Sequence, residues 1–218
     1  MKEFISYSPA MLKTFEQCQK KFEYKYINEI NIPVDSSKMQ LGKNIHALAN
    51  YYLKSFNIDT LEKILDKKEK ELWNNLKNNK YFNLSVIKSE FNITSKFKAY
   101  ILSGRLDALV KDDKDNYYIL DYKTGKIPDN AEFDYQTIIY LIITNKFIKK
   151  YNSLNFVYID LKNNIDEIIK FNKDIKEKYE DILEKKISEL EKCLKYNIYK
   201  KNGYNCNCEY HKICVNQD

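Results

Sequence analysis

The amino-acid sequence predicts an α/β protein: a mixed central sheet flanked by helices, with a helical layer at the N-terminus and a cysteine-rich C-terminal tail. Three observations lead to this prediction. Residues 1–80 carry apolar side chains at helical spacing, whereas residues 81–171 contain several short apolar, β-branched segments. Residues 172–218 begin with a charged helical pattern and end in closely spaced cysteines. The 218 residues suit one domain, which we divide into these three parts.

The N-terminal layer is predicted to contain three helices. The first begins after Ser8, a favourable cap followed by proline, and continues to about Ile27. Its apolar stripe consists of Met11, Phe15, Cys18, Phe22 and Tyr26. A second helix over residues 38–56 follows a loop, and a charged third helix covers residues 60–79.

The middle part is predicted to be an α/β core with five strands and one buried helix. The strands are expected at residues 84–93, 99–111, 117–123, 154–161 and 165–171. Residues 112–116 form a turn between the second and third strands. A helix over residues 133–149 is apolar on most of its surface, so we expect it to be buried. A charged helix over residues 172–196 then leads into the tail.

Composition excludes several classes of protein. With 44% hydrophobic and 31% charged residues, the chain is too apolar for a disordered protein. No apolar run is long enough to span a bilayer and the N-terminus lacks a signal-peptide pattern, so we expect a cytoplasmic protein without a membrane partner. The net charge of +6 permits nucleic-acid binding without establishing it. All but one of the 37 basic residues are lysines, as AT-rich coding favours, and Arg105 is the exception.

The hairpin GRLDALVKDDKDNYYILDYKTG carries the candidate chemistry. A turn centred on Lys114 places Asp107 opposite Asp121 and Arg105 opposite Lys123, on one face of the ribbon. Leu109 and Ile119 share that face, and the predicted core face carries Leu106, Ala108, Val110, Tyr118, Leu120 and Tyr122.

Opposed aspartates with Cβ atoms about 4.5–5.5 Å apart repel each other unless a cation neutralises them. A magnesium ion suits this position, and the main-chain carbonyl of Tyr122 can supply a third oxygen. Lys123 lies on the same face, where an ammonium can orient a water or stabilise phosphate charge. The alternative is a solvated hairpin face. The metal site is favoured because the cluster lies away from the turn, beside Gly104 and Gly125.

These residues resemble a known signature. Asp107 followed by Asp121-Tyr122-Lys123 looks like the D…(D/E)xK motif of PD-(D/E)XK nucleases. The wider pattern is similar to the RecB-like branch, which includes RecB nuclease domains and CRISPR-associated RecB-like exonucleases. The segments that carry the resemblance, in the branch's order, are SYSPAMLKTFEQCQKKFEYKYI, GKNIH, GRLDAL, LDYKTG and a Q-x-x-x-Y element at Gln136 and Tyr140. With the tail they extend over residues 6–214.

The resemblance implies a restriction-endonuclease-like core and a DNA exonuclease that depends on Mg²⁺ or Mn²⁺. The implied metal ligands are His46, Asp107 and Asp121, to which the hairpin geometry adds the Tyr122 carbonyl, and the implied catalytic lysine is Lys123. Gln136 and Tyr140 are implied DNA-binding or site-bracing residues, and we add Arg105 to them because it is the one arginine of the chain. A buried structural histidine is the alternative for His46, and apolar packing is the alternative for Gln136 and Tyr140. Glu90, in the strand before the hairpin, is a weaker candidate.

The cysteines predict a second metal site. Cysteines of a cytosolic protein indicate metal binding or packing rather than disulfides. The tail reads Cys206-x-Cys208-x₅-Cys214, and the resemblance adds Cys18 of the first helix as a fourth ligand of a [4Fe–4S] cluster. The family's tail spacing, C-x₂-C-x₅-C, has one residue more in its first gap. Zinc is the alternative metal, and Cys193 is either a packing residue or a substitute for Cys18.

Two functions from different classes remain. The first is an exonuclease acting on single-stranded DNA or duplex ends in recombination, repair or CRISPR spacer acquisition, with a helicase or CRISPR adaptation proteins as partners. The second is a non-catalytic DNA-binding or assembly module stabilised by an iron–sulfur or zinc site. The complete set of Asp107, Asp121 and Lys123 favours the enzyme. Cleavage polarity, strand preference and oligomeric state stay open.

Overall fold

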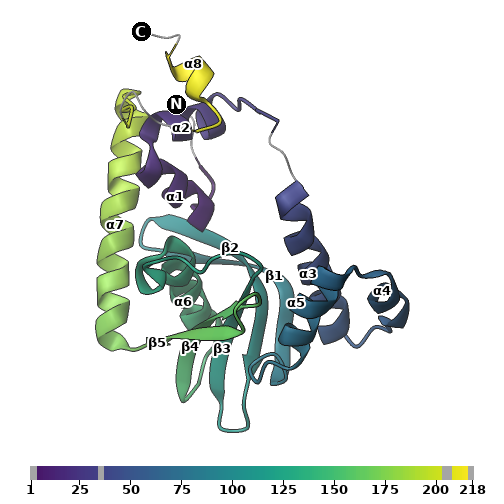
Figure 1. Cartoon of the computed structure of the whole chain (residues 1–218). Coiled ribbons are helices and arrows are strands. Elements are labelled where there is room, and N and C mark those ends of the chain that lie inside the picture. The colour runs from purple at the N-terminus through teal and green to yellow at the C-terminus, as the bar shows by residue number, and fades with distance from the viewer. Residues whose placement is uncertain (1–3, 34–36, 203–207, 216–218) are drawn as a thin grey trace.

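A computed structural model describes residues 4–33, 37–202 and 208–215. Its centre is a five-stranded sheet whose strands follow in chain order (Figure 1). The strands are β1 (Ser85–Phe97), β2 (Tyr100–Lys111), β3 (Asn116–Lys123), β4 (Ser153–Asp160) and β5 (Ile165–Phe171). Strands β3 and β4 run parallel, and the other neighbours are antiparallel. The predicted mixed sheet and its five strands are therefore confirmed.

Helices cover both faces of this sheet. They are α1 (Pro9–Gln17), α2 (Gln19–Phe22), a π-helical turn (Glu23–Ile27), α3 (Ser37–Leu53), α4 (Asp59–Ile64), α5 (Lys67–Lys77), a 3₁₀ turn (Ala131–Phe133), α6 (Tyr135–Phe147), α7 (Lys173–Tyr196) and α8 (His211–Val215). Among the helices that the structure describes, none combines the length and the apolar surface that crossing a bilayer requires.

Two hydrophobic clusters separate the faces of the sheet. On one face, residues of α1, α6 and α7 pack against Leu109 and Ile119. On the other face, residues of α3 and α5 pack against Val110 and Leu120. Figure 1 shows α1 and α7 to the left of the strands and α3 to α5 to the right. Neighbouring residues of the same strands therefore belong to two different cores.

Helix α6 connects the two parallel strands. Parallel neighbours require a crossover, and a helix is the usual one. Residues 137–144 are all buried, so the predicted burial of this helix is confirmed. The helix begins after Asp134, whose carboxylate accepts a hydrogen bond from the N–H of Gln136 at 3.0 Å. This start places Gln136 in the first turn, close to the end of β3.

The first predicted helix is interrupted at Cys18. This residue has an extended backbone, with φ −166° and ψ 118°, and its Sγ accepts a hydrogen bond from the N–H of Lys21 at 3.4 Å. Cys18 therefore ends α1 and caps α2, and the chain continues into the π-helical turn. The prediction of one continuous helix to Ile27 is wrong, because a side-chain cap competes with the helical main-chain bonding.

The third predicted helix consists of two helices, α4 and α5. Between them, Asp66 and Glu69 form a capping box: the N–H of Glu69 donates to Asp66 Oδ1 at 2.8 Å, and the N–H of Asp66 donates to Glu69 Oε2 at 3.0 Å. This reciprocal pair starts a new helix. The charged segment over residues 60–79 is therefore divided.

Candidate active site

The candidate site lies where β2 and β3 separate. The predicted register is present, with Ala108 opposite Leu120, and the ladder between these strands ends at that pair. Beyond the pair Ala108–Leu120, a side chain connects the two strands: Oδ2 of Asp107 accepts a hydrogen bond from the N–H of Tyr122 at 2.9 Å. The hairpin thus opens at Asp107.

This opening corrects two details of the predicted hairpin. The ladder ends before Arg105 and Lys123, so these residues are not a cross-strand pair. Leu106 does not share the core face of Ala108; it packs in the opposite cluster with Leu109. The alternation of side chains depends on regular pairing, which is not maintained through the opening.

His46 of α3 reaches into the opening from the other side. Its Nδ1 lies 3.2 Å from Asp107 Oδ1 and 3.6 Å from Glu90 Oε1, and its Nε2 donates to the carbonyl of Tyr122 at 3.0 Å. Burial lowers the pKa of His46, but hydrogen bonds with Asp107 and Glu90 prevail and raise it to about 10. The two carboxylates therefore favour the protonated ring while no metal is bound. The neutral ring, with its proton on Nε2 toward the Tyr122 carbonyl, is the form that can offer Nδ1 to a metal.

Glu90 has a larger part in this cluster than its sequence indicates. Together, His46, Glu90 and Asp107 are the one group, in the part of the chain described, whose ligand atoms lie close enough to hold a metal ion. Glu90 has a φ of 44°, in the left-handed region that costs a non-glycine residue about 1 kcal/mol or more. Its Oε2 lies 2.6 Å from Nε of Arg105. In the β1–β2 register, Glu90 and Asp107 lie between the pairs Ser89–Ala108 and Phe91–Leu106, which brings their side chains to one place.

Asp121 and Lys123 form an ion pair at the end of β3, with Oδ2 and Nζ 2.7 Å apart. Burial, followed by the charge of Asp107, raises the pKa of Asp121 to about 6. Gln136 of α6 contacts both members of the pair: its Nε2 donates to Asp121, and its Oε1 accepts from Lys123 Nζ at 3.1 Å. Gln136 thereby braces Asp121 and Lys123 from α6.

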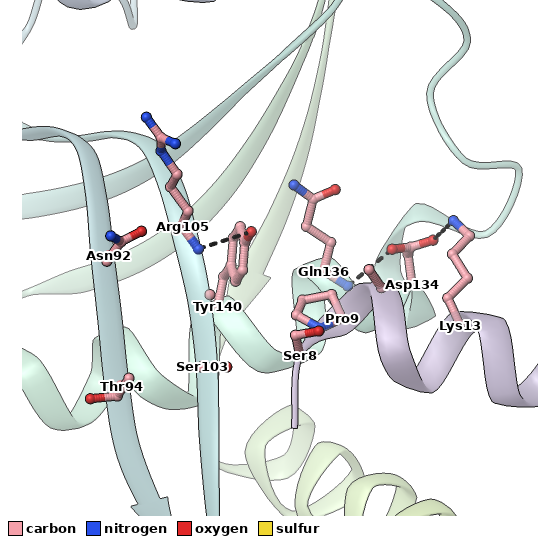
Figure 2. A pocket seen from close by; sticks show the side chains of 12 residues that line it. Ser8, Pro9, Lys13, Asn92, Thr94, Ser103, Arg105, Asp134, Gln136 and Tyr140 are labelled. Carbon is pink, nitrogen blue, oxygen red and sulfur yellow. Dashed lines mark hydrogen bonds and ion pairs between the residues drawn. The ribbon is translucent and has the colours of Figure 1, made fainter. Parts of the chain in front are cut away.

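Tyr140 lies one helical turn after Gln136 and contacts β2. Its hydroxyl oxygen accepts a hydrogen bond from the N–H of Arg105 at 3.4 Å. Burial raises the pKa of Tyr140 to about 12, so the hydroxyl stays protonated. Figure 2 shows Arg105 and Gln136 extending beside a hollow of about 560 Å³, with Tyr140 between them and Pro9 at its edge.

His46, Glu90 and Asp107 are called the candidate metal-binding group below. A second hollow, of about 730 Å³, lies over this group. His46, Glu90 and Asp107 form its floor, and further residues of α3 form one wall. Arg105 lines both hollows, and its side chain is 63% exposed. The two hollows therefore meet at the single arginine of the chain.

The donor atoms suit a divalent cation. Carboxylate oxygens and one imidazole nitrogen are ligands that Mg²⁺ and Mn²⁺ accept. Asp121 is 3% exposed, and among the described residues its Oδ2 makes no hydrogen bond in addition to the ion pair with Lys123. A buried carboxylate with a raised pKa is stabilised by further positive charge. The Tyr122 carbonyl oxygen also lies at the site, where it accepts a hydrogen bond from His46.

The family model described as the PD-(D/E)XK nuclease superfamily matches residues 60–215, more than half of the chain. The chain belongs to this superfamily. The matched residues include Asp107, Asp121 and Lys123, whereas His46 precedes them. PD-(D/E)XK nucleases use divalent metals, so the superfamily and the donor atoms agree.

Solved structures are similar to this PD-(D/E)XK chain to different degrees. A candidate exonuclease from Eubacterium rectale superposes with a TM-score of 0.64 at 10% identity, over 95% of this chain and 88% of its own. A protein named SSO0001 gives a TM-score of 0.48 at 18% identity, over 100% of this chain and 89% of its own. The first of these likenesses supports the restriction-endonuclease-like fold. No curated protein gives a significant match.

The two ends of the described chain meet far from this site, where Figure 1 shows α8 beside α2. The N–H of Lys20 donates to the carbonyl of Lys200 at 3.1 Å, and Lys21 pairs with Glu209 at 3.0 Å. Helices α1 and α2 are thus tied both to the segment after α7 and to the residues that precede α8.

The cysteines lie at this junction. The Cys214 thiol contacts Tyr24, whose pKa is raised to about 12 by burial, then by Cys214, and to a smaller extent by Glu23 and Cys18. Cys208 directly precedes α8 and its carbonyl accepts a hydrogen bond from the N–H of His211 at 3.0 Å. Cys206 lies outside the described residues. Cys193 belongs to α7 and packs against the hydrophobic core, as its helical stripe suggests.

Proposed function

We propose that this chain is a metal-dependent DNA exonuclease of the RecB-like branch. One observation carries the proposal: His46, Asp107, Asp121 and Lys123 come from three elements and converge at one opening of the sheet in a PD-(D/E)XK chain. Burying several carboxylates close together lowers the stability of the fold unless cations or hydrogen bonds compensate their charge. Such a cluster is therefore typical of a functional site. The order of the motifs between residues 6 and 214 supports the RecB-like assignment.

Each side chain then has a role. The residues that would hold Mg²⁺ or Mn²⁺ are His46, Asp107, Asp121 and the Tyr122 carbonyl, with Glu90 placed to join them. A bound cation supplies a Lewis acid that lowers the pKa of a water and neutralises phosphate charge. Lys123 holds its ammonium beside Asp121, where it can orient the attacking water or stabilise the charge of the phosphate. Gln136 keeps Asp121 and Lys123 in position.

The substrate is proposed to be DNA with a free end or a single strand. Arg105 is exposed between the two hollows, where its guanidinium can bind a phosphate. The RecB-like resemblance places such an activity in recombination, repair or CRISPR spacer acquisition in the cytoplasm. A helicase or CRISPR adaptation proteins are the corresponding partners.

The test is a nuclease assay on anaerobically purified protein. End-labelled single-stranded and duplex DNA are incubated with Mg²⁺, with Mn²⁺, and with EDTA. We expect progressive shortening from an end with metal and none with EDTA, and circular DNA should resist. Cleavage of circles would replace the exonuclease by an endonuclease. DNA binding without cleavage under every condition would favour the non-catalytic module.

We also propose that Cys18, Cys206, Cys208 and Cys214 bind a [4Fe–4S] cluster. Cys18 caps α2 and Cys214 contacts Tyr24 in the π-helical turn that follows α2, and these two positions at the junction of the two ends support the proposal. Anaerobically purified protein should be brown, with about four irons and four sulfides per chain. Colourless protein with one zinc per chain would replace the cluster by zinc. Metal-free protein of unchanged stability would leave the cysteines as packing residues.

A further inference from the structure

Three hollows on the surface follow one another through shared lining residues. The hollow of Figure 2 and the hollow over the candidate metal-binding group share Arg105. The latter shares Ala47 and Tyr51 of α3 with a third hollow, of about 280 Å³, between α3, α4 and α5. The third hollow is largely apolar and is lined by Leu48, Leu61, Ile64 and Leu65. A track thus leads from the hollow of Figure 2, across the candidate metal-binding group, to the hollow between α3, α4 and α5.

Tyr51 stands at the border between the metal-binding and apolar hollows. It is 46% exposed, and its ring meets the edge of Phe56 with centroids 5.8 Å apart. A Schellman motif fixes this pair: the N–H of Phe56 donates to the Tyr51 carbonyl at 3.0 Å, the N–H of Ser55 donates to the Tyr52 carbonyl at 2.9 Å, and Ser55 has a φ of 59°. The motif holds the Tyr51 ring in place without burying it.

We propose that Tyr51 stacks on an unpaired nucleobase next to the phosphate that is cleaved. This inference rests on the proposed nuclease function and narrows its substrate to single-stranded DNA or a frayed end. Bases expose their faces to aromatic side chains when they are unpaired, and such stacking tolerates any base. Tyr51 follows His46 by five residues, roughly 7.5 Å along the helix axis, and both side chains line the hollow over the candidate metal-binding group.

The charges around Tyr51 are mixed, and the acids Glu90 and Asp107 belong to the candidate metal-binding group. The basic residues that remain in this hollow favour nucleic acid as the occupant. Lys43 and Arg105 line the same hollow as Tyr51 and can contact phosphates on either side of the stacked nucleotide. The apolar hollow then accommodates the body of the base beside Ile64. A protein partner at this surface is the competing occupant, and the binding experiment below separates the two.

The first experiment measures DNA binding without cleavage, by fluorescence anisotropy of a labelled single strand in EDTA. The variants are Tyr51→Ala, Tyr51→Phe, which keeps the ring, and Tyr196→Ala, which removes a 64% exposed tyrosine from α7. Tyr51→Ala should weaken binding by about 5- to 100-fold, the range for the loss of one stacked base. The other two variants should bind as the wild type does, and a blunt duplex should show no loss with any variant. If Tyr51→Ala lowers the Tm, Tyr51→Leu replaces it.

The second experiment locates the base with abasic sites placed one position at a time. An abasic site at the stacked position should weaken DNA binding by the wild type as much as Tyr51→Ala weakens binding of the intact strand. The same abasic site should not weaken DNA binding by Tyr51→Ala any further. In the cleavage assay Tyr51→Ala should raise KM and leave kcat unchanged, because the ring contacts a base and not the reacting phosphate.

Unchanged binding of single strands by Tyr51→Ala would overturn the inference and leave the surface to a protein partner. A loss that persists with every abasic substrate would overturn it too, since the ring would then act on something other than a base. A wild type that cleaves nothing would overturn the proposed nuclease function instead, and the anisotropy would still decide the role of Tyr51.

Discussion

Gly104 and Tyr140 are in such close contact that a Cβ atom at Gly104 would lie 2.3 Å from Cε1 of the Tyr140 ring. The same ring carries the hydroxyl that accepts the N–H of Arg105. Residue 104 is therefore limited to glycine by a packing contact beside the site. Any larger residue must move β2 or α6, the two elements that place Asp107 and Gln136.

Replacing Gly104 by alanine should destabilise the protein and weaken the site. Overpacking of this kind costs about 1–3 kcal/mol, measured by urea unfolding. Gly125→Ala is the matched control, because a Cβ there meets nothing within 4 Å. Equal stability of the two variants would show that α6 adjusts without cost.

Asp121→Ala and Lys123→Ala should each reduce the cleavage rate by at least about 10²-fold, as the loss of one charge-stabilising group typically does. Both side chains contact each other and Gln136, so DNA binding should stay within a few-fold of the wild type. Lys126→Ala, at a solvent-exposed position beyond β3, is the control and should cleave normally. Wild-type rates in either site variant would exclude this site as the nuclease centre.

Manganese should raise the Tm of the wild-type protein in the absence of DNA. A ligand at 100 times its Kd stabilises a folded protein by about 2.7 kcal/mol. Asp107→Ala removes a carboxylate from the candidate metal-binding group, so the shift should disappear. Asp113→Ala, in the exposed turn at the other end of the hairpin, should keep it. A shift that survives Asp107→Ala would place the metal elsewhere.

DNA binding should be independent of sequence and strongly weakened by salt. Lysine is a point charge, and a single arginine provides little bidentate reading of bases. Titrations of several sequences of equal length at two salt concentrations measure both effects. A preference for one duplex sequence that persists at high salt would contradict this expectation.

Cys208→Ser should release both ends of the chain to protease. If the cysteines share a metal, its loss frees α1 and α2 as well as α8, because contacts such as Lys21 with Glu209 then stand alone. Cys193→Ser is the matched control, since Cys193 packs against the hydrophobic core as part of α7. Limited proteolysis followed by mass measurement identifies the cut sites. Identical digestion of the two variants would show that no cysteine-bound metal holds the two ends of the chain together.

The register of the hairpin could be predicted from the sequence because its turn is determined locally. The Oδ1 atom of Asp112 accepts hydrogen bonds from the N–H groups of Lys114 at 2.9 Å and Asn116 at 3.0 Å. Aspartate is common in turns because its side chain can do this. Once the turn is known, counting along both strands brings Asp107 and Asp121 to the same end.

The features that were not predicted depend on contacts distant in sequence. The opening at Asp107 replaces a ladder bond by a side chain, and no local pattern distinguishes it from regular pairing. The positive φ of Glu90 occurs in a strand whose sequence looks ordinary. Cys18 lies on an apolar stripe, so the periodicity that predicts a helix also hides its break.

The separation of the sheet faces has a consequence for how the site responds to damage. His46 follows Ile45, which is buried in one core, and Gln136 precedes Ile138, which is buried in the other. The candidate active site therefore lies at the boundary between the two hydrophobic clusters. The distances between its side chains depend on how the helices of one cluster are placed relative to the helices of the other. A cavity made deep in either cluster can shift one wall of the site against the other, so impaired cleavage need not point to a residue near the metal.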